Sequence, residues 1–186
     1  MADYTTEQIR NFALVGTSGS GKTTLGEAML VDAGAIGRAG TVEAGTTVSD
    51  WDELEHQFGH SIDSSLLTLD HAGCHFNIID APGRGDFIGK AMSSLPAVET
   101  MVLVLDPAIG IDPVARRMMK IAKERNLPRA IVINKIDAGG DISDFLMTIK
   151  ATFGSECCSI NLPAGNGTSI IRCFQETQGE SDLGNV

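Results

Sequence analysis

The stretch that decides the fold is GTSGSGKT, Gly16–Thr23, which follows the apolar run Asn11–Val15 and precedes a segment with helical periodicity. An apolar strand, a glycine-rich loop and a helix in this order fit the pattern strand–GxxxxGK[ST]–helix. The glycines let backbone N–H groups turn inward around phosphate oxygens, and the following helix points the positive end of its dipole at them. The alternative is an accidental glycine–serine linker, and the flanking strand and helix argue against it.

Individual residues of this phosphate loop have predicted roles. Lys22 would neutralise the β- and γ-phosphates of a nucleotide, and the hydroxyl of Thr23 would hold Mg²⁺. The residues of the loop predicted to bind the nucleotide are Gly16, Thr17, Ser18, Gly19, Ser20, Gly21, Lys22, Thr23 and Thr24.

A second motif, Asp80-Ala81-Pro82-Gly83, follows the predicted strand Cys74–Ile79. Ligands of parallel sheets bind at the carboxyl ends of the strands, so this motif is predicted to lie beside the phosphate loop. Asp80 would reach Mg²⁺ through water, and the Gly83 N–H would bond the γ-phosphate and so sense it. Asp-x-Pro-Gly alone also makes ordinary turns, and its place after a phosphate loop gives it weight.

The third motif is Asn134-Lys135-Ile136-Asp137, again at a predicted strand end. The carboxylate of Asp137 can accept hydrogen bonds from guanine N1–H and N2–H₂, whereas adenine offers no such pair of donors. A mismatched base leaves this carboxylate unpaired, which discriminates by ~10⁴. Lys135 would lie over the base plane, and Asn134 would tie the base loop to the phosphate loop. The motif predicts GTP or GDP as the ligand; the alternative is a turn that only ends a strand.

Strands that alternate with helices predict an α/β fold, with a mostly parallel sheet covered by helices on both faces and one antiparallel hairpin strand. The hairpin turn is predicted at Asp70–Gly73, between the strands Leu66–Leu69 and Cys74–Ile79. Further predicted strands are 101–105, 130–133 and 157–162. One helix is predicted from Lys22 to Gly34, with Leu25, Ala28 and Met29 facing inward, and a short one ends before Pro96. A third runs from the Asp112 cap to about Arg125, with Val114, Met118, Ile121 and Ala122 facing inward. A fourth runs from the Asp141 cap to Gly154. Residues 1–174 would form one domain and residues 175–186 a polar, disordered tail.

Composition limits the class of protein further. The chain has 186 residues and a net charge of −10, so it carries no overall field that would gather nucleic acid non-specifically. No apolar run approaches the ~20 residues that cross a bilayer, and no secretory leader opens the chain. Four cysteines without CxxC spacing favour free thiols in a reducing compartment. We expect a cytoplasmic monomer with no membrane contact.

With these motifs in this order, the chain resembles the guanine-nucleotide domain of the translational GTPases, and within them elongation factor G. The likeness runs from about Ile9 to Ile171. The resemblance implies a P-loop GTPase that hydrolyses GTP with Mg²⁺ on the ribosome and changes conformation as it does so. The matching segments are Arg10–Thr24, Gly40–Trp51, Asp80–Phe87, Asp106–Pro113 and Pro128–Asp137.

The chain departs from that family at functional positions. Arg84 stands where the family has a histidine that orients the attacking water, and Gly19 replaces an aspartate associated with a monovalent cation. Ser61 falls where a threonine would close over Mg²⁺ and the γ-phosphate. Leu162–Gly165 is similar to the point where the family inserts a subdomain before its third guanine-contact loop. No SA[KL] loop follows, so the resemblance implies the front part of a longer factor, cut within the insertion.

Three functions remain open from the sequence. The first is a slow GTPase in which Lys22, Gly83 and Arg84 stabilise the transition state and Thr23, Ser61 and Asp80 hold the metal ion. The second is a GTP-gated binding protein with little hydrolysis, because Arg84 cannot act as a neutral base at pH 7. The third, an ATP-dependent kinase of the phosphate-loop class, is disfavoured by Asn134–Asp137. The long segment Ile36–Ser61 would be a functional or mobile loop.

Weaker candidates have plain structural alternatives. His56 and His60 have a zinc-like spacing without a third ligand nearby, and His71–His75 is better explained as a hairpin turn. The pair Cys157-Cys158 fits packing within a strand. The acidic cluster Asp50, Asp52, Glu53 and Glu55 is predicted to be a solvated loop face.

Overall fold

The computed structural model describes residues 4–49, 55, 61–138, 141–165, 167–176 and 179–185. The chain divides into two compact units, which are described separately: residues 1–105 with 112–132, and residues 106–111 with 133–186. A five-stranded sheet has the order β2-β3-β1-β4-β5. Its strands are β1 (Ile9–Val15), β2 (Ser65–His71), β3 (Cys74–Asp80), β4 (Thr100–Leu105) and β5 (Arg129–Ile133).

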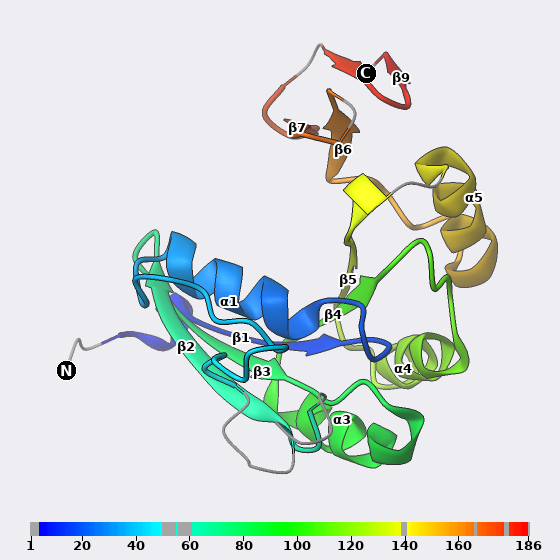
Figure 1. Ribbon diagram of the computed structural model, residues 1–186. Coiled ribbons are helices and arrows are strands. Elements are labelled where there is room, and N and C mark those ends of the chain that lie inside the picture. Colours follow the sequence, from blue (N-terminus) through cyan, green and yellow to red (C-terminus); the bar gives the residue numbers. More distant parts are fainter. Residues whose placement is uncertain are drawn as a thin grey trace. The chain divides into compact units, whose positions relative to one another are not determined.

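Within the first unit, strand β1 lies at the centre of the sheet and runs parallel to both β3 and β4, whereas β2 is antiparallel to β3. Helix α1 (Lys22–Asp32) lies on one face of the sheet, and α3 (Ile88–Ser94) and α4 (Pro113–Glu124) lie on the other (Figure 1). This is the predicted α/β fold with one antiparallel hairpin strand. Three short 3₁₀ turns, at Thr6–Gln8, Gly85–Phe87 and Leu95–Ala97, complete the described elements of this unit.

The buried face of α1 differs from the prediction. Ala28 is exposed, and Leu25 and Met29 are only half-buried. The residues that α1 buries are instead Lys22, Thr23, Gly26, Glu27 and Leu30. A Cβ on Gly26 would lie 2.7 Å from the Cδ1 atom of Leu67, so the helix approaches β2 closely at this point. The apolar periodicity predicted the wrong inner face for α1, because polar side chains with internal partners occupy much of the face that is buried.

The β2–β3 hairpin confirms the predicted turn. His71 pairs with Cys74, and the two residues between them, Ala72 and Gly73, have φ angles of 49° and 77°. Positive φ at both positions is the geometry of a two-residue hairpin turn that follows the twist of the strands. Leu67 and Leu69 point inward and join a core cluster with Leu14, Leu30, Ile78 and Val104.

Helix α4 begins as predicted. Pro113 occupies its first turn, and the Asp112 carboxylate accepts a hydrogen bond from the Ala115 N–H at 2.8 Å. The helix buries Ala115, Met118, Met119 and Ala122, whereas Val114 and Ile121 are half-buried.

The second unit contains α5 (Ile142–Phe153), the 3₁₀ turn Ile136–Ala138 and two small hairpins. Asp141 caps α5, and Gly154 ends it with a φ of 120°. The strand expected at 157–162 is displaced: β6 is Asn161–Ala164, pairing with β7 (Ser169–Arg172) in a separate antiparallel sheet, and Cys157 and Cys158 precede it. Within the expected tail, β8 (Glu180–Ser181) pairs with β9 (Gly184–Asn185). None of the helices in the described ranges has the length and apolar character that a membrane crossing requires.

Candidate nucleotide-binding site

The phosphate loop has backbone geometry that requires its glycines. Gly16, Gly19 and Gly21 have φ angles of 143°, 82° and 90°, which L side chains rarely adopt. A Cβ on Gly16 would also lie 2.3 Å from the carbonyl oxygen of Val104 in β4. The loop is therefore bent sharply between β1 and α1, as the sequence predicts. Ser20 is buried and Thr24 is exposed, while Thr17 and Ser18 are half-buried.

The Lys22 side chain lies within the phosphate loop. Its Nζ donates hydrogen bonds to the carbonyl oxygens of Gly16 and Thr17, each at 3.0 Å. Burial lowers the pKa of Lys22, and the negative charges of Asp80 and Asp112 oppose that shift. The arrangement puts a nearly buried cation where the loop would receive a polyanion.

Thr23 and Asp80 are in direct contact at the carboxyl end of β3. The Thr23 hydroxyl donates to Asp80 Oδ2 at 2.6 Å, and the Asp80 side chain is buried. A hydroxyl and a carboxylate are oxygen ligands of the kind that Mg²⁺ prefers. These two residues therefore fit a magnesium ion, and their contact agrees with the prediction that Asp80 lies beside the phosphate loop.

Gly83 lies directly on the phosphate loop. The Ser18 N–H donates to the Gly83 carbonyl oxygen at 3.0 Å. A Cβ at Gly83 would come within 2.5 Å of both Ser18 N and Lys22 Nζ, and 2.6 Å from the Gly16 carbonyl oxygen. Only glycine fits this contact. The next residue, Arg84, is about half exposed and lies 3.7 Å from the Asp86 carboxylate.

In the second unit, the Asn134–Asp137 motif forms a tight turn after β5. Lys135 has a φ of 56°, and the Ala138 N–H donates to its carbonyl oxygen at 3.1 Å. The Lys135 ammonium lies 3.2 Å from Asp106 Oδ2, and the Asp106 side chain is almost fully buried. Asp106 Oδ1 also accepts the Ala108 N–H at 2.8 Å.

Asp106 is thus the ion-pair partner of a predicted site residue, and the sequence analysis assigned it no role. The available signal was its position directly after the buried strand β4. Asp137 lies in the 3₁₀ turn Ile136–Ala138, and Asn134 lies next to Lys135.

The acidic residue Glu55 corrects the expectation of a solvated loop face. Its side chain is buried, and Oε1 accepts the N–H groups of Ile62 at 2.8 Å and Asp63 at 3.2 Å. Ser61 is half-buried immediately before them. The other members of the acidic cluster, Asp50, Asp52 and Glu53, lie outside the described residues, as do His56 and His60.

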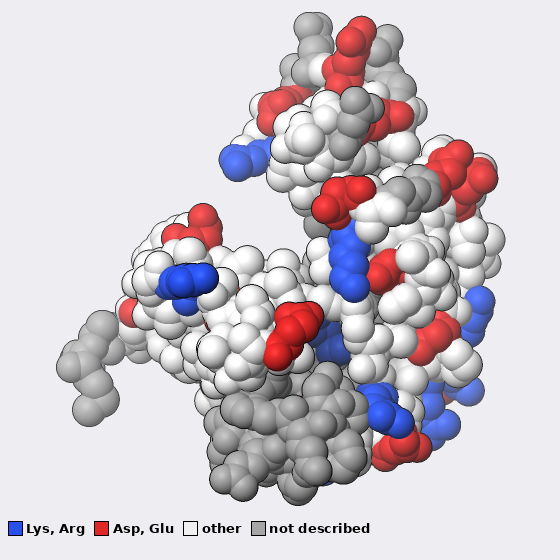
Figure 2. Space-filling model, viewed as in Figure 1, with Lys and Arg blue, Asp and Glu red and all other residues white. Residues whose placement is uncertain are grey.

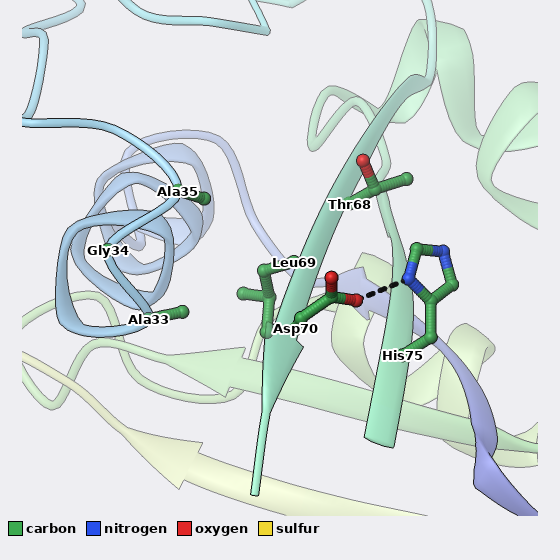
Figure 3. Close-up of a pocket in the computed structure, with 7 residues that line it drawn as sticks. All are labelled: Ala33, Gly34, Ala35, Thr68, Leu69, Asp70 and His75. Atoms are coloured by element: carbon green, nitrogen blue, oxygen red, sulfur yellow. Dashed lines mark hydrogen bonds and ion pairs between the residues drawn. The ribbon is translucent and has the colours of Figure 1, made fainter. Parts of the chain in front are cut away.

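A shallow pocket of about 260 Å³ lies at the end of α1 remote from the phosphate loop, between Ala33–Ala35 and the β2–β3 hairpin. Figure 3 shows the Asp70 carboxylate and the His75 ring beside it. Asp70 Oδ1 lies 2.6 Å from His75 Nδ1. The Tyr4 ring stacks on His75 with ring centroids 5.1 Å apart. The interpretation of His71–His75 as a hairpin is confirmed. None of the four cysteines forms a disulfide, and no cluster of metal-ligating side chains occurs among the residues that the structure describes.

Comparison with known proteins agrees with this geometry. A family model described as the elongation factor Tu GTP-binding domain matches residues 7–170. Peptide chain release factor 3 of Lactobacillus acidophilus is 36% identical over 182 residues, which cover 95% of this chain and 35% of the relative. Peptide chain release factor 3 of a Cyanothece species is 37% identical over 166 residues, 87% of this chain and 31% of the relative. The chain thus spans about a third of the length of these curated relatives.

Solved structures show the same fold. A crystal structure of a protein from Thermus thermophilus matches with a TM-score of 0.85 and 35% identity, covering 90% of this chain and 26% of that one. A bacterial selenocysteine-specific elongation factor matches at 24% identity with a TM-score of 0.59, covering 76% of this chain and 23% of that one, and supports the fold alone. The predicted resemblance to translational GTPases is confirmed, although both curated relatives named above are release factors rather than elongation factor G. This chain belongs to the family of the elongation factor Tu GTP-binding domain.

Proposed function

We propose that this chain binds GTP together with Mg²⁺, hydrolyses it slowly on its own, and uses the change from GTP to GDP to rearrange its loops on the ribosome. The observation that carries the proposal is the contact of Gly83 with Ser18 and Lys22. It links the loop after β3 to the N–H groups and the ammonium that would surround a phosphate. A γ-phosphate bound there would compete with the Gly83 carbonyl for the Ser18 N–H and so change the position of this loop.

The chemical role of each residue follows from what it can donate or accept. Lys22 and the N–H groups of the phosphate loop would stabilise the charge that develops on the phosphate oxygens. Thr23, Asp80 and Ser61 would hold Mg²⁺, which supplies further neutralisation of the β- and γ-phosphates. Asp137 would accept the guanine N–H donors, with Lys135 over the base and Asn134 tying the base loop to the phosphate loop.

Ligand preference gives the first test of the proposal. In calorimetric titrations with Mg²⁺, we expect GTP and GDP to bind far more tightly than ATP. Equal affinity for the guanine and adenine nucleotides, or no binding of either, would contradict the assignment. Competition of ATP against labelled GTP also tests the kinase alternative, since an ATP-dependent enzyme requires ATP to win.

The rate of hydrolysis gives the second test. Arg84 is a permanent cation and is half exposed beside Asp86, so it has no basic nitrogen with which to activate water at neutral pH. We therefore expect slow turnover that ribosomes accelerate. Fast turnover by the chain alone would contradict this mechanism.

The same residue motivates a second candidate function, a GTP-gated binding protein that scarcely hydrolyses its ligand. The Arg84→His variant separates the two. A large gain in turnover would favour the binding protein, in which the arginine replaced a catalytic group. A loss would mean that Arg84 itself stabilises the transition state.

Partners and location belong to the proposal as well. Figure 2 shows the basic side chains in small groups among acidic ones, and the chain carries a net charge of −10. Non-specific attraction to RNA would be weak with such a surface. Ribosome contact would therefore depend on a local surface or on further domains, in a cytoplasmic protein that acts as a monomer.

A further inference from the structure

Glu27 makes a contact that the proposed chemistry does not require. It lies on the inner face of α1, one turn after Thr23, and its side chain is 1% exposed. Oε2 accepts the Gly40 N–H at 2.7 Å, and Oε1 accepts the Val48 N–H at 2.6 Å. Both bonds are short and have an ionised acceptor, which makes them stronger than bonds between neutral groups.

The segment between these two N–H groups is folded on itself; we call Gly40–Val48 the anchored block. The Thr46 N–H donates to the Thr41 carbonyl at 3.2 Å, and the Thr46 hydroxyl accepts the Thr41 N–H at 3.0 Å. A Cβ on Gly40 would lie 2.1 Å from the Thr46 carbonyl oxygen, so the two ends of the block meet where only glycine fits. One side chain of α1 therefore fastens a closed loop at both ends.

A carboxylate is the side chain that this contact demands. Each of its oxygens receives a separate backbone donor, and the two bonds offset part of the cost of burying the charge. Glutamine has one acceptor oxygen, and its NH₂ group would face an N–H donor. Aspartate is shorter by one methylene.

We propose that Glu27 is a positioning residue that fixes the anchored block to α1, so that this part of Ile36–Ser61 is already folded when a triphosphate binds. The inference rests on the proposed function. Helix α1 begins with Lys22 and Thr23, which would meet the phosphates, so the block is attached to the element that forms the site. A preformed block leaves fewer residues to order on binding, and a triphosphate that recruits this loop would gain affinity over a diphosphate.

Trypsin tests the anchor without any nucleotide. Arg38 is exposed, lies two residues before the block, and is the only Lys or Arg between Lys22 and Arg84 in the sequence. Losing a hydrogen bond to a charged group raises the population of the locally opened segment by roughly tenfold or more. We expect Glu27→Gln to speed cleavage after Arg38 by about that factor. Glu43→Gln, the same change at an exposed position of the block, should leave the rate unchanged.

Nucleotide affinity tests the positioning role. Compared with Glu43→Gln, Glu27→Gln should lower the affinity for a non-hydrolysable GTP analogue about tenfold more than it lowers the affinity for GDP. Gly40→Ala disrupts the close contact of Gly40 with the Thr46 backbone and changes no residue of α1, and it should reproduce both effects if Glu27→Gln proves unstable in a thermal melt. Unchanged cleavage in both variants would overturn the anchor. Equal weakening of both nucleotides would overturn the positioning role.

The two proposals fail in different ways. Should the parent chain bind no guanine nucleotide, the proposed function and the positioning role would both be refuted. The trypsin comparison would still decide whether Glu27 holds the anchored block.

Discussion

Replacing Gly83 by alanine is the sharpest perturbation that the structure offers, because it adds one methyl group at the contact between two functional loops. The new Cβ would lie 2.5 Å from Ser18 N and Lys22 Nζ and 2.6 Å from the Gly16 carbonyl oxygen. Ordinary contact begins at 3.4 Å, so the loops would have to separate by about 3.4 − 2.5 = 0.9 Å. The Lys22 end is flexible, but the other two neighbours are backbone atoms.

The size of the effect follows from this overlap. Forcing an extra methyl group into a packed site costs about 1–3 kcal/mol. Losing the bond from the Ser18 N–H to the Gly83 carbonyl adds about 1 kcal/mol. For a chain of this length we expect the melting temperature to fall by roughly 5–15 °C. GTP affinity should fall by at least about tenfold, because the Gly83 N–H would no longer reach the γ-phosphate.

Two measurements on two variants check this prediction. Gly85→Ala is the matched control, since a Cβ there has nothing within 4 Å. Both variants would be melted and then titrated with a non-hydrolysable GTP analogue in the presence of Mg²⁺. If Gly83→Ala melts and binds like Gly85→Ala, the close packing of Gly83 on the phosphate loop is not part of the working site.

Three further predictions concern charges. Asp106→Asn removes the carboxylate that pairs with the half-exposed Lys135 ammonium. Because such a pair is worth about 1 kcal/mol, calorimetry should show a GDP affinity lower by about fivefold. An unchanged affinity would contradict a role for this pair. Burial lowers the pKa of Lys22 in the free protein below 10.5, so the affinity advantage of the parent over Lys22→Ala for inorganic tripolyphosphate should be full below that lowered pKa and begin to decline before pH 10.5 is reached. An advantage that stays constant up to pH 10.5 would refute the shift. The hydrogen bond from His75 holds the pKa of Asp70 below 3.8, and an NMR titration should find that value restored towards normal in His75→Ala; an identical titration in both proteins would show that the pair does not form.

Local patterns were enough to predict most of the framework. The hairpin turn at Ala72–Gly73 and the caps Asp112 and Asp141 depend on a few adjacent residues, whose backbone preferences are strong. The position of Asp80 beside the phosphate loop was predicted from topology, because the parallel strands β1 and β3 end at the same edge of the sheet, and the bond from Thr23 to Asp80 agrees with that prediction.

Contacts made by buried charges could not be predicted in this way. Glu27 sits on a helix whose apolar residues suggested a different inner face, and Glu55 stands in an acidic run whose composition is typical of a solvated loop. Their burial depends on backbone N–H donors from loop residues farther along the chain, which leave no periodic signal in the sequence. The register of β6 with β7 likewise depends on a partner strand rather than on the composition of residues 157–162.

The close approach of Gly16 to Val104 places the start of the phosphate loop beside strands whose amide protons should exchange slowly. The loop leaves β1 against the backbone of β4, and the inward residues of both strands are fully buried. The buried amides of these two strands become accessible to deuterium only when the surrounding sheet opens. The Ser18 amide is different, because its protection comes from the Gly83 carbonyl. Its deuterium uptake would therefore report when the Gly83 loop moves away, while the neighbouring β1 amides remain protected from exchange.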